Sequence, residues 1–199
     1  MNPVMSTLPD DLAAIATLVP WGSRVLDLGC GPGHLLRHLL QDRQCSGYGV
    51  ELDDANVLAC VQQGLPVLQR DLEEGLQMFG DQTFDVVLQL QTLQSLRNVE
   101  AMLREIARVG RTGIVSFPNF AHWPHRLSVL RGRMPVSKSL PFEWYDTPNI
   151  RVGTYADFGH LATRNGLKIT DAFGLDRGRV IRHGINWRAS LAVFKLARA

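Results

Sequence analysis

A chain of 199 residues, of which 45% are hydrophobic, is long enough to bury an adequate core, and this length predicts a single domain spanning residues 1–199. The net charge of +2 balances 21 basic against 19 acidic residues, which argues against a binder of nucleic acid or of an anionic membrane surface. No apolar run reaches the roughly 18 residues of a membrane span. Residues 1–10 lack the pattern of a secretion signal, so we expect a cytoplasmic protein.

The cysteines at positions 30, 45 and 60 are scattered and form no C-x-x-C pair. This spacing predicts neither a disulfide framework nor a metal site. We expect reduced cysteines that mostly serve packing, although Cys30 lies in a glycine-rich stretch.

The chain begins with a predicted short helix within residues 10–19, with Asp10 or Asp11 as its cap. A short apolar strand at 24–28 follows and runs directly into glycines, after which residues 34–40 have helical spacing. This order of strand, glycine turn and helix start is the first sign of a ligand site.

Gly29, Gly31 and Gly33 occupy the turn. Such a turn needs glycine because its backbone adopts conformations that a Cβ forbids and lets a ligand approach closely. The helix beyond it offers free N–H groups and the positive end of its dipole. A purely structural loop is the alternative.

Asp27 distinguishes between possible ligands of this turn. Dinucleotide-binding turns space their glycines as G-x-G-x-x-G, whereas this chain reads G-x-G-x-G with an acid two residues before the first glycine. A carboxylate there repels a pyrophosphate and suits a cationic amino group, such as the methionine end of S-adenosylmethionine. The stretch resembles the first motif of the class I methyltransferases, in which this acid serves the methionine moiety of the cofactor.

The second predicted strand, residues 47–51, ends in Glu51. This acid follows Gly33 by 18 positions, about the spacing at which an acid accepts hydrogen bonds from both hydroxyls of an adenosine ribose. The alternative is a solvated acid at the start of a turn.

Two further strand ends carry polar side chains. The third strand, within 66–71, ends in Asp71, and the methyltransferase resemblance implies that this acid receives the adenine amino group while Leu72 packs on the ring. A solvated turn is the alternative, because two more acids follow. The fourth strand, residues 83–90, carries Gln89 near its end, where ligands bind in open α/β sheets.

The expected ligand is therefore S-adenosylmethionine or S-adenosylhomocysteine. Its predicted binding residues lie in the glycine turn and at the ends of the next three strands. They are Asp27, Gly29, Cys30, Gly31, Gly33, Glu51, Leu52, Asp71, Leu72 and Gln89.

The remaining pattern predicts an amphipathic helix at 99–109, a strand at 112–117, a helix capped by Thr154, and closing strands at 167–173 and 190–196. Strands and helices that alternate in this way indicate parallel crossovers. The predicted fold class is α/β: a single doubly wound, Rossmann-like class I methyltransferase domain. Its sheet is expected to be mostly parallel and seven-stranded, with an antiparallel last strand.

The regular alternation fails between residues 118 and 152, a stretch rich in aromatic residues, prolines and arginines. An irregular segment of such length is usually functional, so we expect a mobile lid or insertion over the pocket. The candidate general acids or bases within it are His122, His125, Glu143, Tyr145 and Asp146. The alternative for the histidines is packing or simple exposure.

Known devices that bind methyl acceptors are absent from the sequence. Enzymes that methylate amino groups on nucleic acid or protein place an Asn/Asp-Pro-Pro-Tyr/Phe turn after the fourth strand, where this chain reads QLQT at 89–92. The cytosine-C5 nucleophile needs a Pro-Cys pair, and no proline precedes a cysteine here. The acceptor is therefore not identified by motif.

Three separated blocks resemble the methionine-biosynthesis protein MetW family: FPNFAHW at 117–123, RGRMPV at 131–136 and LPFEWYDTPNI at 140–150. The stretches DLGCG at 27–31 and VELD at 50–53 agree with it. One departure is Pro32, where family members often carry Asp or Asn, and it leaves the cofactor turn intact. The resemblance implies association with homoserine O-acyltransferase, which these proteins are thought to support.

Two functions remain open. One is a binding and regulatory subunit that holds S-adenosylmethionine, or its demethylated product, and acts on the acyltransferase. The other is a methyltransferase that acts on a small molecule, which proximity alone can achieve without a general base. The absence of a recognisable acceptor device favours the first.

Overall fold

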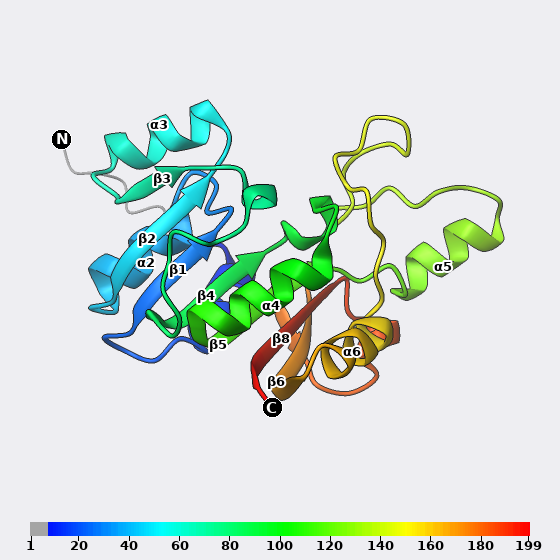
Figure 1. Ribbon diagram of the computed structural model, residues 1–199. Helices are drawn as coiled ribbons and strands as arrows, with labels where there is room; N and C mark the ends of the chain where they lie inside the picture. Colours follow the sequence, from blue (N-terminus) through cyan, green and yellow to red (C-terminus); the bar gives the residue numbers. More distant parts are fainter. Residues whose placement is uncertain (1–7) are drawn as a thin grey trace.

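The computed structural model describes residues 8–199, which form an α/β structure built on one mixed sheet (Figure 1). Among these residues the sheet has eight strands, in the order β3-β2-β1-β4-β5-β8-β6-β7. Strands β1 to β5 are parallel to one another, whereas β8 is antiparallel to both β5 and β6. The strand order reverses between β1 and β4, which is the place where open α/β sheets bind ligands.

The strands follow the predicted positions closely. Their bounds are β1 Arg24–Leu28, β2 Ser46–Glu51, β3 Val67–Gln69, β4 Phe84–Leu90, β5 Gly110–Pro118, β6 Leu167–Asp176, β7 Arg179–Ile181 and β8 Leu191–Arg198. The α-helices are α1 Asp10–Ala16, α2 His34–Asp42, α3 Asp54–Gln62, α4 Val99–Val109, α5 Trp123–Leu130, α6 Tyr155–Arg164 and α7 Ile185–Arg188. Two short 3₁₀ turns, η1 Leu72–Glu74 and η2 Leu93–Ser95, follow β3 and β4.

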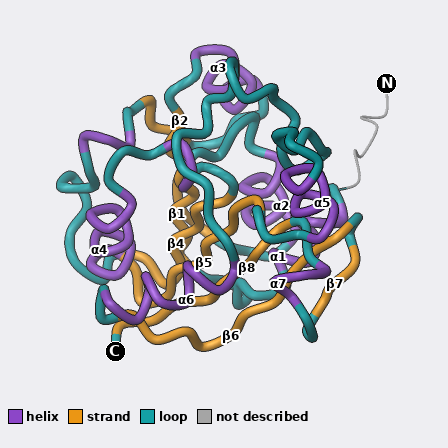
Figure 2. Tube along the Cα trace, turned by 90° about the vertical axis from the view of Figure 1, so that its right-hand side faces the viewer, coloured by secondary structure: helices purple, strands orange, loops and turns teal. Residues whose placement is uncertain are grey.

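Alternate side chains of the strands pack into two apolar layers on opposite faces of the sheet. Leu26 and Leu28 of β1 pack with α4 and α6, and we call this side the α4/α6 face. Val25 packs with α1 and α2 on the other side, the α1/α2 face. In Figure 2, α4 lies on one side of the strands and α1 and α2 on the other. The predicted doubly wound α/β fold is thereby confirmed.

The sheet has one strand more than the seven expected. Residues 177–189, which the sequence suggests are a basic loop, instead hold β7 and the short helix α7. Strand β7 pairs with β6 across a tight turn in which Arg177 and Gly178 have φ of 49° and 77°. Positive φ at both central residues is the geometry of a type I′ hairpin. The sequence did not predict this strand because it is only three residues long and lies among arginines.

Two helix starts differ from the prediction. Pro9 occupies the N-cap of α1, so Asp10 and Asp11 lie inside the first helical turn rather than capping it. Helix α3, for which the sequence predicts Asp54 as the cap, is capped instead by Asp53, whose side chain accepts a hydrogen bond from the Asn56 N–H. Adjacent acids can both serve the start of α3, so sequence alone does not select between them.

Residues 118–152 form a long excursion whose two ends lie together. A bridge pairs Asn119 with Gly153, and the Phe120 N–H donates to the Gly153 carbonyl at 2.9 Å. The excursion is not wholly irregular, because it begins with α5 (Figure 1). Pro124 stands in the first helical turn, where its missing N–H costs nothing.

No helix among residues 8–199 is long and apolar enough to cross a membrane. Most of the stretch in which we expect no secretion signal, residues 1–10, lies outside the described residues.

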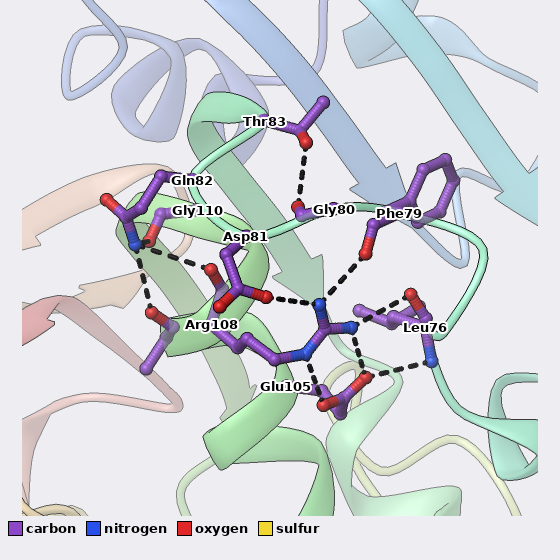
Figure 3. A network of polar contacts seen from close by, with 10 residues as sticks. Leu76, Phe79, Gly80, Asp81, Gln82, Thr83, Glu105, Arg108 and Gly110 are labelled. Carbon is purple, nitrogen blue, oxygen red and sulfur yellow. Dashed lines mark hydrogen bonds and ion pairs between the residues drawn. The ribbon is translucent and has the colours of Figure 1, made fainter.

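Arg108 fixes the irregular stretch between η1 and β4 to helix α4 (Figure 3). Its guanidinium binds both oxygens of Glu105 at 2.8 Å and reaches Asp81 at 2.8 Å. It also donates to the carbonyls of Phe79 and Leu76 at 2.9 and 3.0 Å. Hydrogen bonds from Arg108 lower the pKa of Glu105, so the pair stays charged near neutrality.

We expect Arg108→Ala to lower the free energy of unfolding by about 2–3 kcal/mol, because one change removes the partner of two carboxylates and of two carbonyls. Urea unfolding followed by circular dichroism measures this. The matched control is Arg104→Ala on the same helix, where the 58% exposed side chain lies 3.9 Å from Glu100 and should contribute under about 1 kcal/mol. Equal losses in the two variants would contradict the pinning role of Arg108.

Candidate functional site

Asp27 lies on β1 between its neighbours β2 and β4, at the reversal point of the sheet. The residue is only 3% exposed, and no donor among the described residues bonds its carboxyl group. Burial, reinforced by the charge of Glu51, raises the pKa of Asp27 to about 7. A largely buried carboxyl group that accepts no hydrogen bond is costly, which makes Asp27 a candidate to pair with a ligand.

The glycine turn after β1 has two closed positions and one open one. A Cβ on Gly29 would come within 2.3 Å of Thr92 Cγ2, and one on Gly33 within 2.4 Å of Leu65 Cδ1. Gly31 has φ of 55° and nothing within 4 Å of the place of a Cβ. Gly31 is therefore the position at which a ligand can approach the backbone closely.

The N–H groups of this turn are already used within the protein. Those of Gly29 and Cys30 donate to the Val50 carbonyl at 2.8 and 3.1 Å, and that of Gly33 donates to the Cys30 carbonyl. The Gly31 N–H donates to Glu51 Oε2 at 2.7 Å. A pyrophosphate would find no free donor at these positions and would meet two acids. The residues present therefore fit a ligand with a cationic group better than a phosphate.

Glu51, at the end of β2, lies beside the turn as predicted. Its Oε1 accepts hydrogen bonds from the N–H groups of Leu52 and Asp53 at 2.8 and 3.0 Å, and its Oε2 accepts from Gly31. Each carboxylate oxygen has further lone-pair capacity, so the group can still accept from ligand hydroxyls. Glu51 thus joins the ends of the first two strands and presents negative charge beside Asp27.

The remaining predicted cofactor residues occupy different surroundings. Cys30 directs its sulfur toward Cys60 at 4.0 Å, and burial raises the pKa of the thiol, so its side chain supports the turn from within. Leu52 is well exposed. Asp71 caps η1 by accepting from the Glu73 N–H at 2.9 Å, and Leu72 begins that turn.

Gln89 differs from the other predicted cofactor residues. Its side chain is fully buried, and neither of its polar atoms has a hydrogen-bond partner among the described residues. It alternates with Val87, which belongs to the α4/α6 face. Asp27 alternates with Val25 and so points to the opposite face, which separates the two side chains.

The structure does not assemble the candidate acids and bases of residues 118–152 into one site. His122 and His125 are buried at the start of α5, with ring centroids 5.3 Å apart. Glu143, Tyr145 and Asp146 lie exposed on the later loop, and no described hydrogen bond joins them to the histidines.

His125 is held on both sides of its ring. Its Nδ1 lies 3.2 Å from the Asn119 carbonyl and its Nε2 lies 2.9 Å from Ser137 Oγ. Burial lowers the pKa of His125, so the ring is neutral near pH 7. A neutral ring that donates to the carbonyl accepts from the serine, which is a packing role of the kind left open by the sequence.

Sequence reasoning missed Asn119 as an organising residue. Its amide nitrogen donates to the Ala189 carbonyl at 2.8 Å, and its side-chain oxygen accepts from the Tyr155 N–H at 3.1 Å. It therefore joins the start of the excursion to α6 and to the residues before β8. The sequence gives no local signal of this role, because the partners of Asn119 lie more than 30 residues away.

The loop after β4 connects the glycine turn to the excursion. Thr92 fills the space beside Gly29, and its hydroxyl donates to the Leu28 carbonyl at 3.3 Å. Two residues later, the Gln94 carbonyl accepts from the N–H groups of Ile150 and Arg151 at 3.0 and 2.9 Å. The end of the excursion is thus attached to the element that packs against the turn.

Among residues 8–199 no group of three or more His, Cys, Asp or Glu side chains is arranged to hold a metal ion. The donor set at the reversal point is made of two acids and a glycine turn. It suits an organic cation that carries hydroxyl groups.

Comparison with known proteins agrees with this geometry. The family model described as "Methionine biosynthesis protein MetW" matches residues 9–196. A "Bifunctional methionine biosynthesis protein MetXA/MetW" of Rhodopirellula baltica is 37% identical over 206 residues, covering 96% of this chain and 33% of that protein. The chain thus spans about a third of the length of the curated relatives it matches.

Solved structures share the fold at low sequence identity. An S-adenosylmethionine-dependent methyltransferase from Mesorhizobium loti superposes with a TM-score of 0.72 and 15% identity, over 95% of this chain and 98% of that one. The magnesium protoporphyrin IX methyltransferase of Synechocystis PCC 6803, solved with bound SAH, gives 0.67 and 19%, over 100% and 90%. The chain therefore belongs to the family described as methionine biosynthesis protein MetW, and its fold is that of the class I S-adenosylmethionine-dependent methyltransferases.

Proposed function

We propose that this chain binds S-adenosylmethionine or S-adenosylhomocysteine and, in the cytoplasm, binds homoserine O-acyltransferase and supports its activity. The observation that carries the cofactor part is the buried, unpartnered carboxyl group of Asp27 beside the open side of Gly31. The amino group of the cofactor would pair with Asp27, and its ribose hydroxyls would donate to Glu51. Asp71 and Leu72 would receive the adenine, as the family resemblance implies.

The partner part of the proposal rests on two supports. The Rhodopirellula baltica relative is named as a bifunctional protein with MetXA and MetW parts, and only 33% of its length matches this chain. Covalent joining of two parts favours an association between their separate counterparts. The family resemblance implies that the counterpart here is homoserine O-acyltransferase.

We assign the contact to residues 118–152, and their surface chemistry supports this. Leu130, Trp144 and Tyr145 are 84%, 69% and 71% exposed. Arg131 and Arg133 of the same excursion are exposed as well. Tryptophan, tyrosine and arginine are the residue types enriched at the centres of protein interfaces, and a soluble monomer seldom exposes so many large apolar side chains together.

The alternative function is methyl transfer to a small molecule. S-Adenosylmethionine, when bound, would supply an activated methyl group, and the protein would contribute orientation and exclusion of water. The described residues present no assembled general acid or base, since the histidines of α5 are packed. This favours the binding and regulatory function.

Stability without ligand should depend on pH through Asp27. The folded protein holds this proton more tightly than the unfolded chain, whose aspartate has a pKa of about 3.9. The stabilisation is complete below that value and is lost as the pH rises through about 7. From about pH 5 to about pH 8, the free energy of unfolding should fall by roughly 2.5 kcal/mol more in the wild type than in Asp27→Asn.

Urea unfolding at the two pH values measures this difference, with the exposed Asp146→Asn as control. A cofactor amino group would instead favour the ionised acid. Affinity for S-adenosylhomocysteine in the wild type should therefore rise over the same pH range, and this rise should vanish in Asp27→Asn. If the free energy of unfolding and the affinity had the same pH dependence in wild type and Asp27→Asn, Asp27 would not be the titrating group that pairs with the ligand.

Glu51→Ala should weaken binding of S-adenosylhomocysteine about tenfold or more, because each lost hydrogen bond to a charged group costs about 1.5–3 kcal/mol. Glu51→Gln keeps one acceptor oxygen for the Leu52 and Asp53 N–H groups, so its loss should be smaller. Isothermal calorimetry measures both, and Asp54→Ala at the start of α3 is the control. Unchanged affinity in a folded Glu51→Ala protein would exclude Glu51 from the site.

The double variant Trp144→Ala/Arg131→Ala should abolish copurification with the acyltransferase of the same cell and lower acyl transfer. An interface anchor typically contributes about 2 kcal/mol or more. Affinity for S-adenosylhomocysteine should stay nearly unchanged. The control is Trp21→Ala/Arg111→Ala, which removes a 64% exposed tryptophan and a 69% exposed arginine at the opposite ends of the strands.

Acyl transfer is measured with and without S-adenosylmethionine in each pair. Normal copurification and activation by the Trp144→Ala/Arg131→Ala protein would contradict the assigned contact. Consumption of S-adenosylmethionine on a purified metabolite without any partner would instead establish the methyltransferase alternative.

A further inference from the structure

A cavity of about 580 Å³ lies between α4, α6 and the end of the 118–152 excursion. Its volume is within the range of roughly 300–1,000 Å³ typical of small-molecule sites. Its apolar lining includes Phe117, Phe158 and Leu93, each 4% exposed and each part of the α4/α6 core layer. The cavity therefore offers an apolar body of a ligand a largely preformed surface.

The cavity is separate from the cofactor site. Its core residues belong to the α4/α6 face, whereas Asp27 alternates with Val25 on the α1/α2 face. None of Asp27, Gly31 and Glu51 lines the cavity. A ligand there would not compete directly with one held at the glycine turn.

The polar lining of the cavity carries unbalanced positive charge. Arg97, Arg151 and Arg164 line it, and none of them forms an ion pair with an acid among the described residues. Arg151 donates only to the backbone carbonyls of Ile150 and Arg97, which leaves its charge uncompensated.

The lining also contains two acids, so its three arginines exceed its carboxylates by one. Glu100 lies 3.9 Å from Arg104, outside the cavity, and Asp157 accepts from the Thr154 hydroxyl at 2.7 Å in the cap of α6. Gln94 adds a buried side-chain oxygen without a partner. The lining thus combines an apolar floor with an excess of guanidinium groups.

We propose that this cavity is a second binding site, distinct from the cofactor site, for an amphipathic organic anion. The apolar body of the ligand packs against Phe117 and Phe158, and its carboxylate, sulfonate or phosphate group lies among Arg97, Arg151 and Arg164. The proposal does not depend on the proposed function.

The test uses a charged probe and a neutral probe of similar shape on the full chain. Anilinonaphthalene sulfonate has an aromatic body and one fixed negative charge, and N-phenyl-1-naphthylamine lacks the charge. We expect saturable fluorescence enhancement with both, and tighter binding of the sulfonate. Arg97→Glu and Arg164→Glu should each weaken the sulfonate about fivefold and leave the neutral probe nearly unchanged.

Two variants test the location. Leu161→Trp, which places a larger side chain in the lining, should abolish binding of both probes. The controls are Arg179→Glu on β7, which makes the same charge change elsewhere, and Trp144→Ala, which removes an exposed aromatic surface outside the cavity. Both controls should bind both probes as the wild type does.

Three outcomes would overturn the proposal. They are an absence of saturable sulfonate binding, equal sulfonate affinity in Arg97→Glu, Arg164→Glu and the wild type, and loss of binding in Trp144→Ala, which would locate the probe on the excursion. Circular dichroism establishes that each variant is folded. If Leu161→Trp does not fold, the two arginine variants still decide the matter.

Discussion

The properties of the candidate site depend on one buried acid. The carboxyl group of Asp27 lies at the reversal point of the sheet and accepts no hydrogen bond from the described residues. Burying an acid without a partner costs free energy, and Asp27 meets that cost by retaining a proton to about pH 7. Glu51 adds to the cost, since its charge also raises the pKa of Asp27. Such an arrangement reduces stability in the absence of a partner for the carboxyl group, and a cation would supply that partner.

The backbone of the glycine turn also disfavours an anionic ligand. Its N–H groups are consumed by Val50, Cys30 and Glu51, so it carries little of the positive potential that a phosphate-binding turn presents. Only Gly31 leaves open space for a ligand. The turn and the two acids are therefore both better suited to a cationic ligand than to a phosphate, although for different physical reasons.

The loop after β4 lies between three functional regions. Thr92 packs on the glycine turn, Leu93 lines the cavity, and the Gln94 carbonyl holds the end of the excursion. A displacement of this short loop would move the residues packed against it in all three places, because close-packed side chains transmit strain. The glycine turn, the cavity and the excursion are thus linked through one element.

The sequence by itself determined the alternation of strands and helices, the glycine turn with Asp27, and the acid at the end of β2. These features depend on local periodicity and on short spacings, which a linear pattern records. The sequence placed the caps of α1 and α3 one or two residues too late, because adjacent residues can all begin a helix. It missed β7, because the pairing of this short strand depends on hydrogen bonds across a two-residue turn.

Only the tertiary structure decided the roles that depend on distant partners. It buried His125 between Asn119 and Ser137, and it used Asn119 to join α6 to the residues before β8. It also gathered Arg97, Arg151 and Arg164 around one cavity. Burial, pKa and charge balance depend on which segments pack together, and residues so far apart in the chain carry no local signal of that packing.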